Sequence, residues 1–130
     1  MNDQKRPTAL VLDDFEEDRY LLKRILGGLS INVIEASDVY EALQASKTLV
    51  PHQDVFFMDV LISPNETGLS ILAGKETKFK WLKDINIIVV SGLGDMATIM
   101  KAMGLGADGY VIKPYSEGLI KKKLIEIGVL

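Results

Sequence analysis

Hydrophobic and polar positions follow two different periods along this chain. Five short runs are rich in apolar residues, and the run at residues 55–58 is apolar at every position, which is typical of a strand buried on both faces of a parallel sheet. The runs cover residues 8–12, 31–36, 55–58, 85–90 and 109–112. Between them, apolar residues recur three and four positions apart, as they do on the inner face of a helix. The pattern therefore predicts five strands that alternate with five helices.

The predicted helices carry start signals and apolar stripes. Ser37 is expected to cap the second helix and Ser116 the last one, because serine oxygens accept hydrogen bonds from free backbone N–H groups. Residues 60–67 are rich in turn-forming side chains and are expected to form a loop before a helix that starts at Gly68 or Leu69. Three methionines stand at helical spacing in the fourth helix: Met96, Met100 and Met103. Such a stripe is more often core packing than a binding surface, so we expect it to face the sheet.

This alternation implies an α/β fold with one open, five-stranded parallel sheet and helices on both faces. A closed βα barrel would need roughly 250 residues, and this chain has 130. We therefore expect a single domain over residues 1–130, with its core at about residues 7–127.

Composition narrows the functional classes. The net charge of −3 argues against a dedicated nucleic-acid binder, which usually carries a basic excess. The chain has no cysteine, so it can form neither a disulfide framework nor a thiolate metal site. No apolar run approaches the roughly 20 residues of a membrane span, and the polar start lacks the apolar core of a signal peptide. We expect a cytoplasmic protein without direct nucleic-acid or membrane contacts.

Polar side chains gather where the predicted strands end. Asp13 and Asp14 follow the first strand and Asp59 follows the third, while Ser91 and Lys113 end the fourth and fifth. Because the carboxyl ends of parallel strands meet at one edge, these residues are expected at the edge where open α/β sheets bind ligands.

The chemistry of this group points to phosphoryl transfer. Three clustered carboxylates repel one another unless a cation joins them, and an all-oxygen site with water suits Mg²⁺. Lys113 and Ser91 supply a positive charge and a hydrogen-bond donor for an incoming anion. A carboxylate next to a metal ion can act as the nucleophile on phosphorus, which would give an aspartyl phosphate.

Two glycine-rich segments raise a dinucleotide-binding alternative. Residues 104–109 match G-x-G-x-x-G, but they follow a helix and precede a strand, which is the reverse of the required context. Residues 92–97 lie between a strand and a helix, but too little chain follows them to complete a dinucleotide fold. We therefore favour the phosphoryl chemistry.

The chain, with its polar residues in this order at the ends of the predicted strands, resembles the receiver domains of bacterial two-component response regulators. The resemblance covers about residues 7–127 and rests on an acidic pair, an acceptor aspartate, a hydroxyl, an aromatic residue and a Lys-Pro pair. These are Asp13-Asp14, Asp59, Ser91, Tyr110 and Lys113-Pro114. It implies a (βα)5 flavodoxin-like fold and a signalling role in a phosphorelay.

The resemblance also implies a role for each residue. Asp59 would be the phosphoacceptor, and Asp14, Asp59 and the backbone carbonyl of Leu61 would bind Mg²⁺ directly, with Asp13 acting mainly through water. Ser91 and Lys113 would contact the phosphoryl oxygens. Tyr110 would change rotamer together with Ser91, and the Lys113-Pro114 bond would be cis.

The implied partners are a sensor histidine kinase or phosphotransfer protein as donor and an output partner or effector domain. The output partner would bind the face between Asp95 and Ile127, and homodimerisation on phosphorylation stays an alternative. The protein would catalyse only its own phosphorylation and dephosphorylation, so it would not be an enzyme in the usual sense.

Two other functions stay open. A small Mg²⁺-dependent phosphatase with an aspartyl nucleophile would carry D-x-D, where this chain has Asp13-Asp14-Phe15. A receiver-like binding module that never accepts phosphate would typically lack a key acid or the lysine, and this chain has them all.

One departure from the family pattern concerns the segment after the acceptor. The family usually places proline four and glycine eight residues after the acceptor, whereas Pro64 and Gly68 stand five and nine residues after Asp59. The loop is therefore expected to be one residue longer. A smaller departure is Gly92, where the family commonly has alanine.

Overall fold

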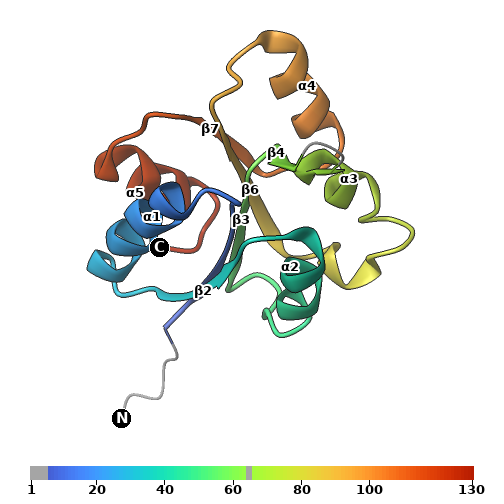
Figure 1. Cartoon of the computed structure of the whole chain (residues 1–130). Coiled ribbons are helices and arrows are strands. Elements are labelled where there is room, and N and C mark those ends of the chain that lie inside the picture. The colour runs from blue at the N-terminus through green and yellow to red at the C-terminus, as the bar shows by residue number, and fades with distance from the viewer. Residues whose placement is uncertain (1–5, 64–65) are drawn as a thin grey trace.

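The computed structural model describes residues 6–63 and 66–130, and its centre is a five-stranded parallel sheet (Figure 1). The strands stand in the order β2-β1-β3-β6-β7. They are β1 (Thr8–Leu12), β2 (Asn32–Ala36), β3 (Val55–Met58), β6 (Asn86–Ser91) and β7 (Gly109–Ile112). This confirms the predicted open parallel sheet. The bounds predicted for the first, third and fifth strands agree residue for residue.

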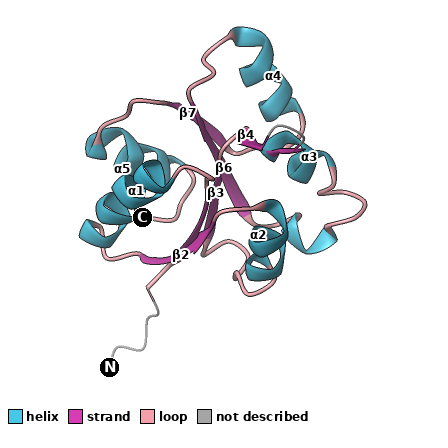
Figure 2. Ribbon diagram, in the orientation of Figure 1, coloured by secondary structure: helices cyan, strands magenta, loops and turns pink. Residues whose placement is uncertain are grey.

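Helices cover both faces of the sheet, as predicted (Figures 1 and 2). One face carries α1 (Glu16–Gly28) and α5 (Glu117–Glu126); the other carries α2 (Val39–Ser46), α3 (Gly68–Ala73) and α4 (Met96–Gly104). A short 3-10 helix, η1 (Lys80–Leu82), precedes β6. Successive residues of β1 divide between the two faces, because Leu10 packs on the α2 side and Val11 on the α1 side. The sheet is therefore held between two hydrophobic cores, one on each face, and these cores fix the positions of its strands.

The segment expected to be a loop after β3 contains a small hairpin instead. β4 (Leu61–Ser63) and β5 (Glu66–Thr67) pair in an antiparallel two-stranded sheet, while Pro64 and Asn65 lie outside the described residues. The register shifts between Leu61 and Ser63. A shift of this kind is typical of a β-bulge or a similar irregularity of pairing.

Of the two predicted helix caps, the one for the last helix is confirmed and the one for the second helix is wrong. Ser116 caps α5 as predicted, since its Oγ accepts the N–H of Leu119 at 3.1 Å. The prediction for Ser37 is wrong, because Asp38 caps α2 by accepting the N–H of Glu41 at 2.8 Å. Ser37 instead donates its N–H and its hydroxyl to the Glu41 carboxylate. Both neighbours are good capping residues, and sequence alone could not choose between them.

The prediction for the methionine stripe of α4 is also wrong. Met96, Met100 and Met103 are 68%, 65% and 43% exposed. The inner side of the helix is formed by Ala102, which is fully buried, and the following Leu105 packs on the same core. Helical spacing identifies a stripe, but a helix with two apolar stripes can turn either one toward the sheet.

Across residues 6–63 and 66–130, no helix combines the length and apolar character needed to cross a membrane.

Candidate functional site

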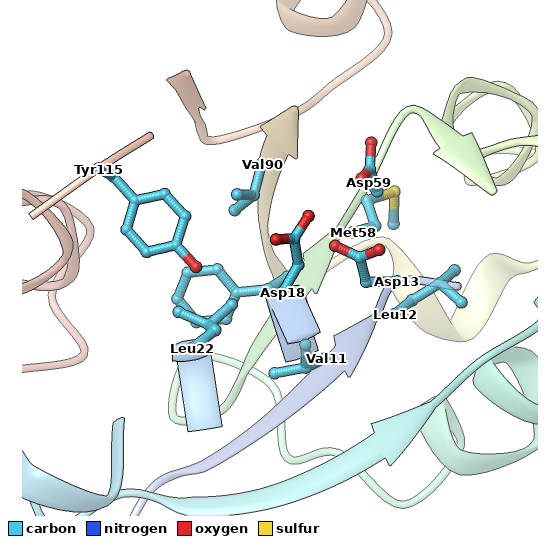
Figure 3. A pocket seen from close by; sticks show the side chains of 10 residues that line it. Val11, Leu12, Asp13, Asp18, Leu22, Met58, Asp59, Val90 and Tyr115 are labelled. Atoms are coloured by element: carbon cyan, nitrogen blue, oxygen red, sulfur yellow. The ribbon is translucent and has the colours of Figure 1, made fainter. Parts of the chain in front are cut away.

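The ammonium group of Lys113 joins three carboxylates at the carboxyl edge of the sheet. Its Nζ donates to Asp13 Oδ2 at 2.8 Å, to Asp18 Oδ2 at 2.7 Å and to Asp59 Oδ2 at 2.8 Å. Figure 3 shows the three acidic side chains around one pocket, with those of Asp13 and Asp59 following β1 and β3 and that of Asp18 coming from α1. The sequence predicted that Asp13, Asp59 and Lys113 would meet, and the structure brings them together.

Backbone pairing fixes the positions of two of these carboxylates. Asp59 follows β3 directly and donates its N–H to the Leu12 carbonyl at 3.0 Å, so it stands beside the end of β1. Asp13 donates its N–H to the Ala36 carbonyl at 3.2 Å, and its Oδ1 accepts the N–H of Phe15 at 2.9 Å. The same carboxylate therefore helps to start α1 and presents its other oxygen to Lys113.

The cluster is largely shielded from water. The side chains of Asp13, Asp59, Lys113 and Asp18 are 8%, 10%, 18% and 34% exposed. Burial raises the pKa of Asp13, although the hydrogen bond from Lys113 works in the opposite direction. Burial alone would lower the pKa of Lys113, but its hydrogen bonds to Asp13, Asp18 and Asp59 outweigh this and raise it. The lysine is therefore a firmly held positive charge among three carboxylates.

Asp14 lies apart from this hydrogen-bonded group. It is exposed, directly after the residue that binds Lys113. Within the described part of the chain, no three acidic or histidine side chains are arranged so that they could hold a metal ion. Carboxylate oxygens are nevertheless the ligands that Mg²⁺ prefers, so Asp13, Asp14 and Asp59 fit such an ion by type. Leu61 stands two residues after Asp59 and opens β4, and its side chain lies outside the described ones.

Ser91 and Tyr110 meet through a third residue, Leu93. Ser91 is buried, and its Oγ accepts the N–H of Leu93 at 3.1 Å, while its carbonyl accepts the N–H of Lys113 at 2.8 Å. The half-buried Tyr110 donates its hydroxyl to the Leu93 carbonyl. Burial raises the pKa of Tyr110. Ser91 and Tyr110 are therefore both joined to the start of the loop that leads into α4.

A glycine makes room for the backbone of Asp59. A Cβ placed on Gly68 would lie 2.2 Å from the Asp59 carbonyl oxygen, which is closer than any real side chain can approach. Gly68 also donates its N–H to the Val60 carbonyl at 2.9 Å. Gly68, which stands nine residues after Asp59, therefore packs directly on the Asp59 backbone. The Lys113-Pro114 bond is cis, as the resemblance implied.

Two residues of the site were missed by sequence reasoning. Asp18 binds Lys113 from the first turn of α1, where an acidic residue is ordinarily explained by the helix dipole. Tyr115 lines the pocket beside Asp13 and Asp18, and burial raises its pKa to about 12. Neither belongs to a motif, so only the fold could bring them to the site.

Comparisons with known proteins agree on one family. The family model of the response regulator receiver domain matches residues 9–125. The chemotaxis protein CheY of Pseudomonas aeruginosa is 29% identical over 123 residues, which are 91% of this chain and 93% of that protein. A crystal structure of a response regulator from Burkholderia pseudomallei, with a phosphorylated aspartic acid, calcium ion and citrate, is 28% identical with a TM-score of 0.77. It is matched over 91% of this chain and 66% of that one.

Other relatives are longer than this chain. The probable transcriptional regulator ycf27 of Guillardia theta is 31% identical over 113 residues, which are 87% of this chain. This chain spans 42% of the length of that relative.

Proposed function

Because the chain belongs to the response regulator receiver domain family, we propose that it accepts a phosphoryl group on Asp59 and thereby switches the binding of a partner. The observation that carries this proposal is the position of the Asp59 carboxylate, which is buried at the sheet edge with Oδ2 2.8 Å from Lys113 Nζ. The ammonium of Lys113 therefore lies where it can stabilise the negative charge that gathers when this carboxylate attacks phosphorus.

In the proposed step, an oxygen of Asp59 attacks the phosphorus of a phosphohistidine or a small acyl phosphate. The bond from phosphorus to the donor breaks, and the donor leaves with the electron pair. Lys113 stabilises the negative charge on the phosphoryl oxygens, because its ammonium already lies beside the nucleophile. Asp13, Asp14, Asp59 and the Leu61 carbonyl would hold Mg²⁺, which when bound supplies further neutralisation of charge.

The effect of phosphorylation would reach the partner-binding face through Ser91 and Tyr110. Both side chains already bind Leu93, so a movement of the Ser91 hydroxyl toward a phosphoryl oxygen would free the Leu93 N–H and loosen the contact with Tyr110. The face between Asp95 and Ile127 would then change shape, which is a two-state response to a local charge. Its exposed Met96, Met100 and Ile112 offer the apolar area that a partner or effector domain would cover.

The test is labelling of the intact protein with a small acyl phosphate and Mg²⁺, followed by mass spectrometry. We expect the mass of one added phosphoryl group in the wild type and none in Asp59→Asn. Asp84→Asn, a change of the same kind at an exposed position before β6, should label like the wild type. Undiminished labelling of Asp59→Asn would refute the assignment of the acceptor. Multiple turnover of a generic phosphomonoester would instead favour the phosphatase alternative.

A further inference from the structure

Lys113 uses all of its hydrogen-bonding capacity on three carboxylates. An ammonium group has three N–H donors and no acceptor, and each of the three carboxylates accepts from it at 2.7 to 2.8 Å. Asp13 and Asp59 belong to the proposed phosphorylation site. Asp18 has no part in the proposed phosphoryl transfer, and yet it makes the shortest of the three contacts.

Asp18 holds the ammonium from the first turn of α1 rather than from a strand end. It is the third residue of α1, and in Figure 3 its side chain approaches the pocket from that helix. Beyond it lies a surface hollow of ≈ 320 Å³, lined by Asp18, Lys113 and three neighbours: Leu21, Pro114 and Tyr115. Asp18 is the most exposed of the three carboxylates, so water can replace Lys113 as its partner at little cost.

A phosphoryl group on Asp59 would bring new acceptor oxygens to a lysine that has no free donor. We propose that Asp18 is a positioning residue that withholds part of the Lys113 ammonium from the phosphoryl group and so lowers the affinity of the site for it. This inference rests on the proposed function. The Asp18 carboxylate acts in two ways, since it occupies one of the three N–H groups and offsets part of the lysine charge at 2.7 Å.

The experiment measures binding of beryllofluoride, a mimic of the phosphoryl group, by calorimetry at saturating Mg²⁺. Asp18→Asn should bind the mimic about two- to fivefold more tightly than the wild type, which is the range expected for a partly exposed ion pair. The matched control is Glu17→Gln, which removes one negative charge from the same helical turn. Glu17 is not among the described contacts of Lys113, so this variant should bind like the wild type.

A double-mutant cycle separates an effect through Lys113 from a general effect of charge. In the Lys113→Met background, Asp18→Asn should leave the affinity for beryllofluoride unchanged. If Lys113→Met does not fold, Lys113→Gln retains a hydrogen-bond donor for the buried carboxylates and serves in its place. An equal gain with and without Lys113, or a gain for Glu17→Gln of the same size, would overturn the inference.

Unchanged or weaker binding by Asp18→Asn would also overturn it, because Asp18 would then orient Lys113 productively or not act at all. These failures differ from a failure of the proposed function. In that case the wild type would bind no beryllofluoride and Asp59 would take up no phosphoryl group.

Discussion

Replacing Lys113 by methionine tests whether the ammonium group stabilises the fold as well as the site. Methionine has a similar length and no charge, so the change removes the positive charge that Asp13 and Asp59 share while disturbing the packing little. Both carboxylates are about nine-tenths buried. We therefore expect the variant to be much less stable than the wild type at neutral pH when divalent cations are absent.

The size of the loss follows from the burial of each contact. Removing one partner of a buried ion pair costs about 3 to 5 kcal/mol, whereas a pair at the surface is worth about 1 kcal/mol or less. Lys113 is itself partly accessible, and its contact with Asp18 lies near the surface. Taking the low end of the buried range for the shared contact with Asp13 and Asp59, we expect a loss of about 3 kcal/mol.

The assay is urea unfolding of both proteins in a chelating buffer at several pH values. The loss should shrink as the pH falls. Burial already raises the pKa of Asp13, and a carboxyl whose folded pKa is raised gives stability at low pH that is lost as the pH rises through that pKa. Without Lys113 this dependence becomes stronger, so protonation of Asp13 at acid pH should recover part of the lost stability.

Lys123→Met is the matched control. Lys123 Nζ lies 3.5 Å from Glu126 Oε1 in a partly exposed ion pair within α5. Its replacement should therefore lower the free energy of unfolding by less than about 0.5 kcal/mol. A loss below about 1 kcal/mol for Lys113→Met would refute the view that the buried carboxylates depend on this ammonium. An equal loss for both variants would do the same.

Two further predictions concern positions next to the cluster. Gly68→Ala should cost about 2 kcal/mol or more in urea unfolding, because its Cβ would collide with the Asp59 carbonyl. Gly28→Ala, where nothing lies within 4 Å, should cost nothing, and equal stability of the two variants would contradict the steric argument. Burial raises the pKa of Tyr115 to about 12, so its contribution to stability should be present below its ordinary pKa and be lost as the pH rises through about 12. In an ultraviolet titration, Tyr115→Phe should remove an ionisation step near pH 12, and an unchanged titration curve would count against this environment.

The sequence was most informative where one physical requirement dominated. A strand in a parallel sheet must be apolar on both faces, and residues 55–58 satisfy this at every position. The polar residue that ends such a run is then confined to the sheet edge. For this reason the positions of Asp13, Asp59 and Lys113 could be predicted without knowing any contact between them.

The sequence was least informative where two local arrangements had similar energies. Ser37 and Asp38 are equally good capping residues, and α4 could have turned its methionines inward. The hairpin formed by β4 and β5 depends on pairing between two very short segments rather than on a periodic pattern. In each case the outcome is decided by tertiary packing that a single sequence does not display.

Sheet order explains why Lys113 and Ser91 should respond to one chemical event. β6 lies between β3, which leads to Asp59, and β7, which leads to Lys113. Neighbouring strands are about 4.8 Å apart, so Lys113 and Asp59 must extend toward each other across the end of β6. Ser91 ends β6, and its hydroxyl oxygen accepts the Leu93 N–H. If Asp59 accepts a phosphoryl group as proposed, the hydroxyl on the adjacent strand β6 and the ammonium on the outer strand β7 are the two donors that this sheet edge offers to it.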